Sequence, residues 1–270
     1  MRELNVAVVQ MSPQLSKMED NVGAMSQFVT RIATEQPVDV IVFPELSVTG
    51  YEGGGRFAQM AQRVPGAVTN ILGQRASEFG VYILIGMAIK EDVETVLYNG
   101  AVLIAPDGEV AGQYRKVHLP AEERLVFRPG YQIKPFETEI GTLGVMVGWD
   151  LAFPEVARSL MLSGAEIILL PAAWQTKDAD MWRTLLVARA YENDIFIAAA
   201  NRVGEEPSYD FAGQSAVLSP GGSVTAALEE PEEGYVVVRM DLDEVRHRRE
   251  ESQVMLARQP AAYRSIVRKY

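Results

Sequence analysis

The chain has 270 residues, 48% of them hydrophobic and 23% charged, so it is long enough to bury a full hydrophobic core. Lysine and arginine number 25 against 36 aspartates and glutamates, and the net charge of −11 repels a nucleic-acid backbone. The absence of cysteine excludes disulfides, thiolate metal sites and thiol nucleophiles, and two histidines supply a metal site or a Ser-His-Asp triad poorly.

Apolar runs in the sequence are short. None reaches the roughly 18 residues of a membrane span, and the apolar run near the N-terminus is too short for a signal peptide. We therefore expect a cytoplasmic protein that needs no metal or cofactor and has neither nucleic acid nor a membrane as a partner.

The first half of the chain alternates β-rich runs with helical patterns, a rhythm typical of α/β folds. In chain order we expect a strand at 4–10, a helix at 18–34, a strand at 38–43, a helix at 68–79, and strands at 81–88, 97–104 and 109–114. The turn Ala105-Pro106-Asp107-Gly108 joins the last two strands, because its residue types favour a hairpin.

The second half continues this alternation, and we expect it to persist to the end of the chain. The expected elements are a strand at 143–147, a helix at 154–163 ended by Gly164, a strand at 167–170, a helix at 179–193 and a strand at 195–200. No linker or repeat divides the sequence, which predicts one domain over 1–270. The last stretch, 250–270, has the composition of a docking tail, and we expect it to pack on another subunit.

Two charged side chains stand at the ends of expected strands. Glu45 follows the wholly apolar run VIVFP, and Lys116 follows the strand that ends in Tyr-Arg. Ligands of open α/β folds gather at the carboxyl ends of strands, so Glu45 is a candidate base. A solvated surface role remains the alternative for both residues. His118 is expected to pack or to form hydrogen bonds rather than to catalyse.

Seven motifs in order give the chain a resemblance to a known family. They are AVVQM, FPELSVTGY, YRKVHLP, GWDLAFPE, ARAYENDIFIAAAN, FAGQSAVLSPGG and RQPAAY, which together span nearly the whole sequence. This set resembles the nitrilase or carbon-nitrogen hydrolase superfamily. The resemblance implies an α/β fold of the αββα sandwich type and a Glu-Lys-Cys triad that hydrolyses an amide, carbamoyl or nitrile C–N bond through a thioester.

The resemblance also implies roles for individual residues. Glu45 corresponds to the base, Lys116 to the lysine and Glu123 to the second glutamate of the family. A desolvated carboxylate can take a thiol proton, and a fixed ammonium can hold that carboxylate charged and stabilise an oxyanion. The backbone N–H of Trp149 is the expected second oxyanion donor. Asp150 is expected to fix the local turn rather than to react, and so is Glu155 at the start of the next helix.

The family's cysteine belongs at position 148, where this sequence has glycine. Gly148 tolerates a strained backbone, but it leaves a void of about the size of CH2-SH and no atom to form a thioester. We expect little or no turnover from this chain. Three explanations stay open: a nucleophile removed from a competent amidase to trap substrate, a natural pseudoenzyme that keeps its pocket for binding or assembly, and a water in the void that Glu45 activates.

Two aromatic residues fall on loops that surround the acyl pocket in the family. Tyr51 is one, and Trp174 is the other, with core packing beneath a loop as its alternative. Trp182 is expected on a buried helix face. We expect the substrate to be a small amide that releases ammonia, with an N-carbamoyl compound or a nitrile as alternatives. The resemblance further implies a homodimer or a higher homo-oligomer.

Overall fold

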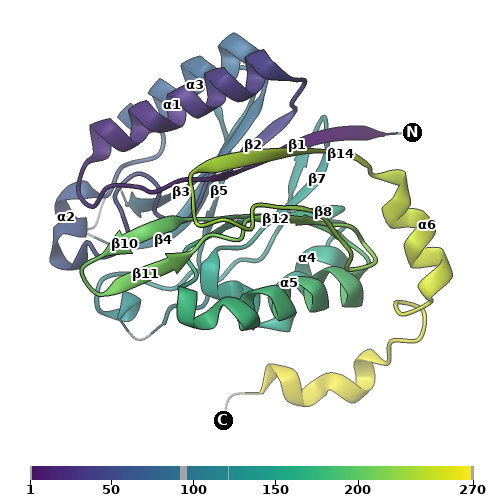
Figure 1. Cartoon of the computed structure of the whole chain (residues 1–270). Helices are drawn as coiled ribbons and strands as arrows, with labels where there is room; N and C mark the ends of the chain where they lie inside the picture. The colour runs from purple at the N-terminus through teal and green to yellow at the C-terminus, as the bar shows by residue number, and fades with distance from the viewer. Residues whose placement is uncertain (1, 92–95, 121, 269–270) are drawn as a thin grey trace.

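The structure is a computed structural model and describes residues 2–91, 96–120 and 122–268. Two six-stranded sheets lie face to face, and helices cover the outer face of each (Figure 1). The chain therefore forms the four-layered αββα sandwich that its motifs implied. Each layer depends on alternating apolar runs that bury one or both faces of a strand.

The first sheet has the strand order β14-β1-β2-β3-β4-β5. Strands β1, β2 and β3 pair in parallel, whereas β14, β4 and β5 are antiparallel to their neighbours. The strands are β1 (Glu3–Gln10), β2 (Val40–Val42), β3 (Tyr82–Lys90), β4 (Leu97–Ile104), β5 (Val110–Arg115) and β14 (Gly234–Asp241). The expected hairpin of β4 and β5 is present, and its turn contains Gly108 at φ +88°.

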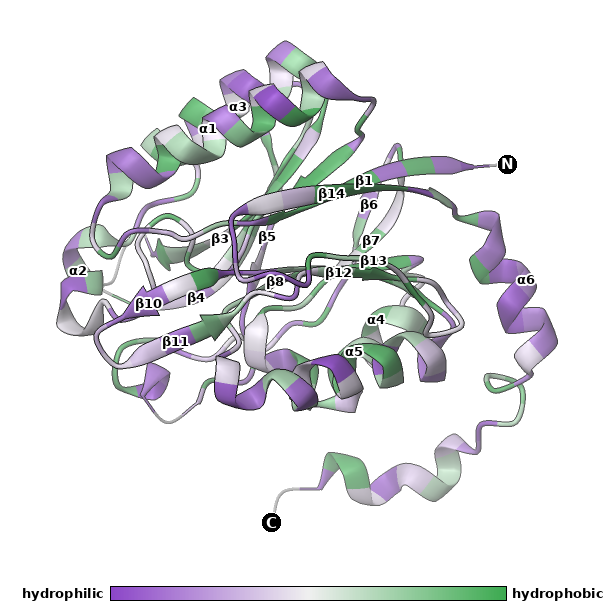
Figure 2. Cartoon of the chain, in the orientation of Figure 1, coloured by the Kyte–Doolittle hydropathy of each residue, from purple (hydrophilic) through white to green (hydrophobic). Residues whose placement is uncertain are grey.

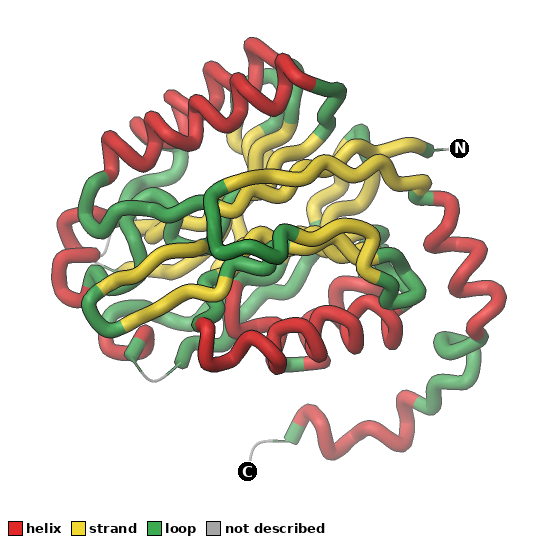
Figure 3. The backbone as a smooth tube through the Cα atoms, viewed as in Figure 1, coloured by secondary structure: helices red, strands yellow, loops and turns green. Residues whose placement is uncertain are grey.

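The second sheet has the strand order β13-β12-β9-β8-β7-β6. Its strands are β6 (Phe136–Thr138), β7 (Gly141–Val145), β8 (Ile167–Ala172), β9 (Phe196–Asn201), β12 (Ala216–Leu218) and β13 (Val224–Ala227). A separate hairpin of β10 (Val203–Glu206) and β11 (Tyr209–Ala212) extends beyond this sheet. Figure 3 distinguishes the strands of both sheets from the loops at their ends.

Helices cover both outer faces of the sandwich. The described α-helices are α1 (Met18–Glu35), α2 (Phe57–Met60), α3 (Ala67–Phe79), α4 (Pro154–Leu162), α5 (Ala179–Asn193) and α6 (Asp243–Ser252). Helices α1 and α3 lie on the first sheet, and α4 and α5 lie on the second (Figure 1). None of the helices in the described part of the chain is long and apolar enough to span a membrane.

Three apolar layers hold the sandwich together. Side chains from the inner faces of both sheets, among them Val6 and Leu169, form the central layer. The other two layers lie between each sheet and its helices. Figure 2 shows the corresponding concentration of hydrophobic residues along the strands and the hydrophilic surface of the helices. Burial of these apolar side chains is the main stabilising contribution to the fold.

The expected alternation of helices and strands to the end of the chain is wrong. Six consecutive strands, β9 to β14, follow α5 before α6 begins. Short turns join β10 to β11 and β12 to β13, so these segments satisfy their backbone by local antiparallel pairing without a crossover helix.

The C-terminal segment leaves the sandwich as an extended arm (Figure 1). Its start, up to Ser252, belongs to helix α6, and a 3-10 helix covers Pro260–Val267. Leu256 and Val267 are 80% and 87% exposed. Residues 269–270 of the expected tail lie outside the described residues. Docking of this arm on a second subunit stays a prediction.

Candidate active site

The end of β2 places Glu45 between the two sheets. The backbone N–H of Glu45 donates to the carbonyl of Ala172 in the second sheet at 3.3 Å. Gly86 of β3 permits this course, because a Cβ atom there would lie 2.5 Å from the Cα of Glu45. The side chain of Glu45 is buried. The alternative of a solvated acid at a sheet edge is therefore excluded.

Lys116 follows the last residue of β5 and is buried with Glu45. Its Nζ donates to Oε1 of Glu45 at 2.6 Å and to Oε1 of Glu123 at 2.7 Å. Asn99 of β4 reinforces the same pair, since its Nδ2 lies 2.7 Å from Oε1 of Glu45 and 3.0 Å from Oε2 of Glu123. The structure thus brings together the three charged residues expected from the sequence, and it adds Asn99, which sequence reasoning missed.

Tyr51 completes the surroundings of the second glutamate. Its hydroxyl donates to Oε1 of Glu123 at 2.9 Å, the oxygen that also accepts from Lys116. Burial, together with the Glu123 carboxylate, raises the pKa of Tyr51 well above its ordinary value. The hydroxyl therefore stays protonated and remains a donor. We use the term triad cluster for Glu45, Lys116, Glu123, Asn99 and Tyr51.

Burial and charge oppose each other within the triad cluster. Burial raises the pKa of Glu45 to about 7, although the Lys116 ammonium lowers it. Burial acts against the charge of Lys116, but the Glu123 and Glu45 carboxylates outweigh it and raise the pKa of Lys116. Lys116 is accordingly a fixed cation at neutral pH, while Glu45 can gain or lose a proton there.

The elbow after β7 begins at Gly148. This residue has φ +48°, in the left-handed region that glycine enters without steric penalty, and it starts a 3-10 helix over Gly148–Ala152. A Cβ atom built at Gly148 would lie only 2.1 Å from Oε2 of Glu45. The prediction of an empty space beside Gly148 is therefore wrong. With no side chain at 148, the Glu45 carboxylate occupies the space that a Cβ atom would need.

Asp150 holds the elbow and points away from the pocket, as expected. Oδ2 of Asp150 accepts from the Tyr114 hydroxyl at 2.8 Å and from the N–H of Val147 at 3.2 Å. Oδ1 accepts from the N–H of His118 at 2.9 Å and lies 2.9 Å from its Nδ1. The ring of His118 also stacks on Phe153 with centroids 3.6 Å apart. These contacts fit the structural roles expected for Asp150 and His118.

Glu155 lies away from the elbow backbone that it was expected to fix. It stands in the first turn of α4 and is exposed to solvent. A carboxylate at this position stabilises the N-terminus of α4 through the helix dipole.

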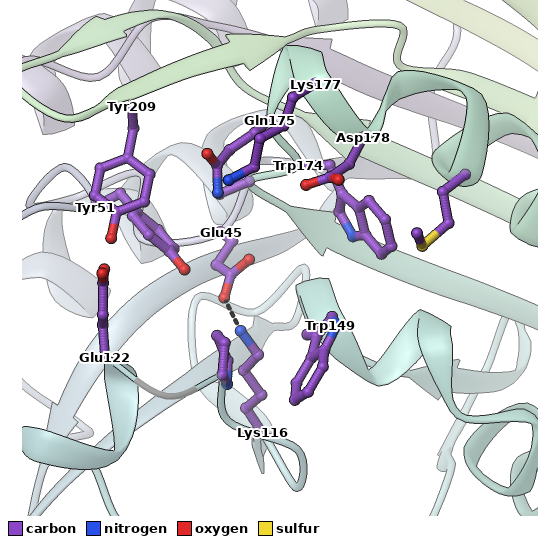
Figure 4. Close-up of a pocket in the computed structure, with 13 residues that line it drawn as sticks. Glu45, Tyr51, Lys116, Glu122, Trp149, Trp174, Gln175, Lys177, Asp178 and Tyr209 are labelled. Atoms are coloured by element: carbon purple, nitrogen blue, oxygen red, sulfur yellow. Dashed lines mark hydrogen bonds and ion pairs between the residues drawn. The ribbon is translucent and has the colours of Figure 1, made fainter.

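A pocket of about 370 Å³ opens above the triad cluster (Figure 4). Its lining residues are Glu45, Tyr51, Lys116, Pro120, Glu122, Trp149, Ala173, Trp174, Gln175, Lys177, Asp178, Met181 and Tyr209. Tyr51 and Trp174 both face this cavity, as the resemblance implied, and the indole of Trp174 donates to the Gly148 carbonyl at 3.1 Å. Trp174 also packs against the buried Trp182, so Trp174 both lines the pocket and packs in the core.

Sequence reasoning missed several of these lining residues. Tyr209 comes from the β10–β11 hairpin and reaches the pocket only through the tertiary fold. Gln175, Lys177 and Asp178 follow Trp174 directly, so the segment after β8 could have been identified from that one residue. Within the described ranges, no three His, Cys, Asp or Glu side chains are grouped so that they could hold a metal ion.

Comparison with known proteins identifies the family. The family model described as carbon-nitrogen hydrolase matches residues 5–250. A nitrilase of Pyrococcus abyssi is 37% identical over 91% of this chain and 93% of its own, and a 2-oxoglutaramate amidase of Bacillus subtilis is 30% identical over 88% and 91%.

A solved structure agrees with these relatives. It is a glutamate-to-glutamine mutant of the amidase from Nesterenkonia sp. AN1, in which the acetamide moiety of fluoroacetamide is covalently added at the active-site cysteine. It superposes with a TM-score of 0.84 at 26% identity, covering 97% of this chain and 96% of its own. The extent of these matches shows that the chain belongs to the carbon-nitrogen hydrolase family.

Proposed function

We propose that this site is built to hydrolyse a small amide and that the chain as it stands has lost the nucleophile of that reaction. The observation that supports the proposal is the pairing of buried Lys116 with Glu45 and Glu123 at the floor of the pocket, next to the elbow at Gly148. Two relatives are named as an amidase and a nitrilase, and the active-site cysteine of the Nesterenkonia amidase mutant carries the covalently added acetamide moiety of fluoroacetamide.

With a thiol at position 148, we propose the following reaction. Glu45 takes the thiol proton, and the thiolate attacks the amide carbonyl to form a tetrahedral intermediate. Lys116 and the backbone N–H of Trp149 stabilise its oxyanion. The C–N bond breaks, and the proton held by Glu45 leaves with ammonia. Glu45 then deprotonates a water, which hydrolyses the thioester to the carboxylic acid and restores the thiol.

Each charged residue has one task in this scheme. The pKa of about 7 lets Glu45 both accept and return a proton near neutral pH. Glu123 does not line the pocket, and it bonds the ammonium of Lys116 as well as Tyr51 and Asn99. Lys116 therefore keeps a carboxylate partner when Glu45 is protonated.

The test is to restore the thiol by Gly148→Cys and to measure ammonia release from small amides, N-carbamoyl compounds and nitriles. Removing the nucleophile of a serine protease lowers turnover about a millionfold, while the rest of the site keeps a rate roughly 10³ to 10⁴ times that of the reaction in water. We expect turnover of one amide to rise at least about a hundredfold, a small part of that range, because the new side chain must also displace Glu45 from its present place.

The matched control carries both Gly148→Cys and Glu45→Gln. It keeps the thiol and the shape of the pocket but removes the base, so we expect it to be as inactive as the chain itself. If Gly148→Cys is folded and its thiol reacts with an alkylating reagent while no substrate of the panel turns over, the proposal is wrong. Preference for an N-carbamoyl compound or a nitrile would keep the chemistry and replace the substrate class.

A binding or assembly role is the second candidate. It is favoured by one observation: the Glu45 carboxylate fills the place of a nucleophile while the pocket of about 370 Å³ beside it stays open. Calorimetric titration of the unaltered chain with each compound of the substrate panel tests it. Affinity of the unaltered chain together with an inactive Gly148→Cys variant would favour this candidate. We further propose that the chain assembles as a homodimer or a higher homo-oligomer.

A further inference from the structure

A buried ion pair near the pocket has no part in the proposed reaction. The side chains of Arg202 and Glu206 are 0% and 2% exposed and form a salt bridge that spans β10, the first strand of the β10–β11 hairpin. Burying two charges is costly unless their remaining hydrogen-bonding groups are also satisfied. We propose that Glu206 is a positioning residue, which holds the loop of Tyr51 so that the Tyr51 hydroxyl stays on Glu123. This inference rests on the proposed function.

The carboxylate of Glu206 binds the loop through its backbone. Oε1 accepts the N–H of Tyr51 at 2.9 Å, and Oε2 accepts the N–H of Glu52 at 2.6 Å. The approach is so close that a Cβ atom at Gly50, which has φ +77°, would lie 2.9 Å from Oε1. Two successive N–H groups on one carboxylate fix both the place and the direction of this loop.

The hairpin and the loop are also tied together by their side chains. The carboxylate of Glu52 accepts from the N–H and the hydroxyl of Ser208 at 2.8 and 2.7 Å. The ring of Tyr51 packs edge-on against Tyr209 and Phe211, with centroids 5.0 and 5.6 Å apart. The loop is therefore tied to the hairpin, and Glu206 is the hairpin residue whose carboxylate bonds the loop backbone.

Tyr51 carries this geometry into the triad cluster. Its hydroxyl donates to Oε1 of Glu123 at 2.9 Å, and Lys116 donates to the same oxygen at 2.7 Å. In Figure 4, Tyr51 and Tyr209 stand together on the side of the pocket that carries Glu122, opposite Trp174. A shift of about 1 Å in a positioned group is enough to lower a rate substantially. Glu206 thus acts on the reaction through Tyr51, although it does not line the pocket.

The test is a double-mutant cycle in the Gly148→Cys background. Glu206→Asp keeps the charge on Arg202 but shortens the reach to the two N–H groups, and Tyr51→Phe removes the hydroxyl from Glu123. We expect Glu206→Asp to lower kcat about tenfold when Tyr51 is present and less than about twofold when Tyr51→Phe is also present, because residues of one network couple. The KM is expected to change less than kcat.

Two further variants guard this result. Glu166→Asp is the matched control, because Glu166 also receives an arginine and a backbone N–H, from Arg2 and Thr142, yet does not line the pocket; its kcat should stay within about twofold. Glu206→Gln replaces Glu206→Asp if the latter does not fold, as judged by thermal unfolding. An equal loss of kcat with and without Tyr51→Phe would show a merely structural ion pair and would overturn the proposal.

A second readout does not need amide turnover. The chain has no cysteine, so the thiol introduced by Gly148→Cys is its single site for iodoacetamide. If Glu206→Asp displaces the Tyr51 hydroxyl from Glu123, the negative charge of Glu123 is less well compensated and disfavours the thiolate. We therefore expect Glu206→Asp to shift the pH profile of the alkylation rate to higher pH when Tyr51 is present, and not when Tyr51→Phe is also present. If this shift occurs but no substrate turns over, the proposed function fails and the positioning role stands. If neither kcat nor the alkylation profile responds, the positioning role fails.

Discussion

Two buried acids, Asp150 within the elbow and Glu45 beside Gly148, differ in how their oxygens are used. Both oxygens of Asp150 accept from groups of the protein, namely the Tyr114 hydroxyl, the N–H of Val147 and His118. Glu45 gives Oε1 to two donors, whereas its Oε2 lies in the space of a side chain at Gly148. Asp150 is fully committed to structure, and Glu45 keeps one oxygen for chemistry.

This difference teaches that burial alone does not identify a reactive acid. Asp150 and Glu45 are 0% and 1% exposed, so their burial is the same. What separates them is the direction of the donors: those of Asp150 fasten the backbone of the elbow, while Glu45 meets an ammonium and an amide and borders a pocket. Burial raises the pKa of Glu45 to about 7, which suits an acid that must exchange a proton.

Removing the charge of each acid gives the sharpest contrast in stability. Asp150→Asn replaces one carboxylate oxygen by an NH2 group, which faces the N–H and O–H donors of Val147, His118 or Tyr114 and cannot accept from them. Because these buried donors lose an acceptor, we expect the free energy of unfolding to fall by about 3 kcal/mol. Glu45→Gln leaves Lys116 paired with Glu123, so we expect a change within about 1 kcal/mol. Urea denaturation followed by circular dichroism measures both. Equal losses for the two variants would break the distinction.

The pH dependence of stability should follow Glu45. Its pKa is raised in the folded chain to about 7, from 4.5 without the fold, so the folded state binds its proton more tightly. Its contribution is complete below about pH 4.5 and is lost as pH rises to about 7. The expected loss is on the order of 3 kcal/mol.

Glu45→Gln serves as the control for this pH dependence. The difference in the free energy of unfolding between the chain and Glu45→Gln, measured by urea denaturation at several pH values, should fall between pH 4.5 and 7. A difference that is flat over this range would show that Glu45 stays ionised in the fold and would contradict the contrast with Asp150.

The strand pattern and the family resemblance together indicated the charged part of the site. Glu45 lies three residues after β2 and Lys116 directly follows β5, so both stand near strand ends, whereas Glu123 was identified through the resemblance alone. Asn99 was missed because it lies within β4, where one polar residue among apolar ones carries no signal of its partners. Glu206 lies 155 positions from Tyr51, so its contact exists only in the folded chain.

Two other expectations failed for a physical reason that sequence does not carry. The void at Gly148 was inferred from the missing side chain, but a neighbouring flexible carboxylate takes up the space. The alternation of helices after α5 was extrapolated from the earlier rhythm, whereas β10 to β13 pair through short hairpins. In both cases the outcome depends on which neighbour is close in space.

Substitutions in the C-terminal arm give the smallest expected effect on stability. They test whether the site that contains Asp150 and Glu45 works independently of oligomerisation. Leu256 and Val267 are the most exposed large apolar residues of this arm. Replacing both with glutamate should change the free energy of unfolding by less than about 0.5 kcal/mol per site, since neither is buried. If the arm docks on a second copy, the pair of substitutions lowers the mass measured by light scattering while the turnover of Gly148→Cys stays the same. An unchanged mass would contradict docking of the arm through these residues, and a loss of turnover would show that assembly reaches the triad cluster.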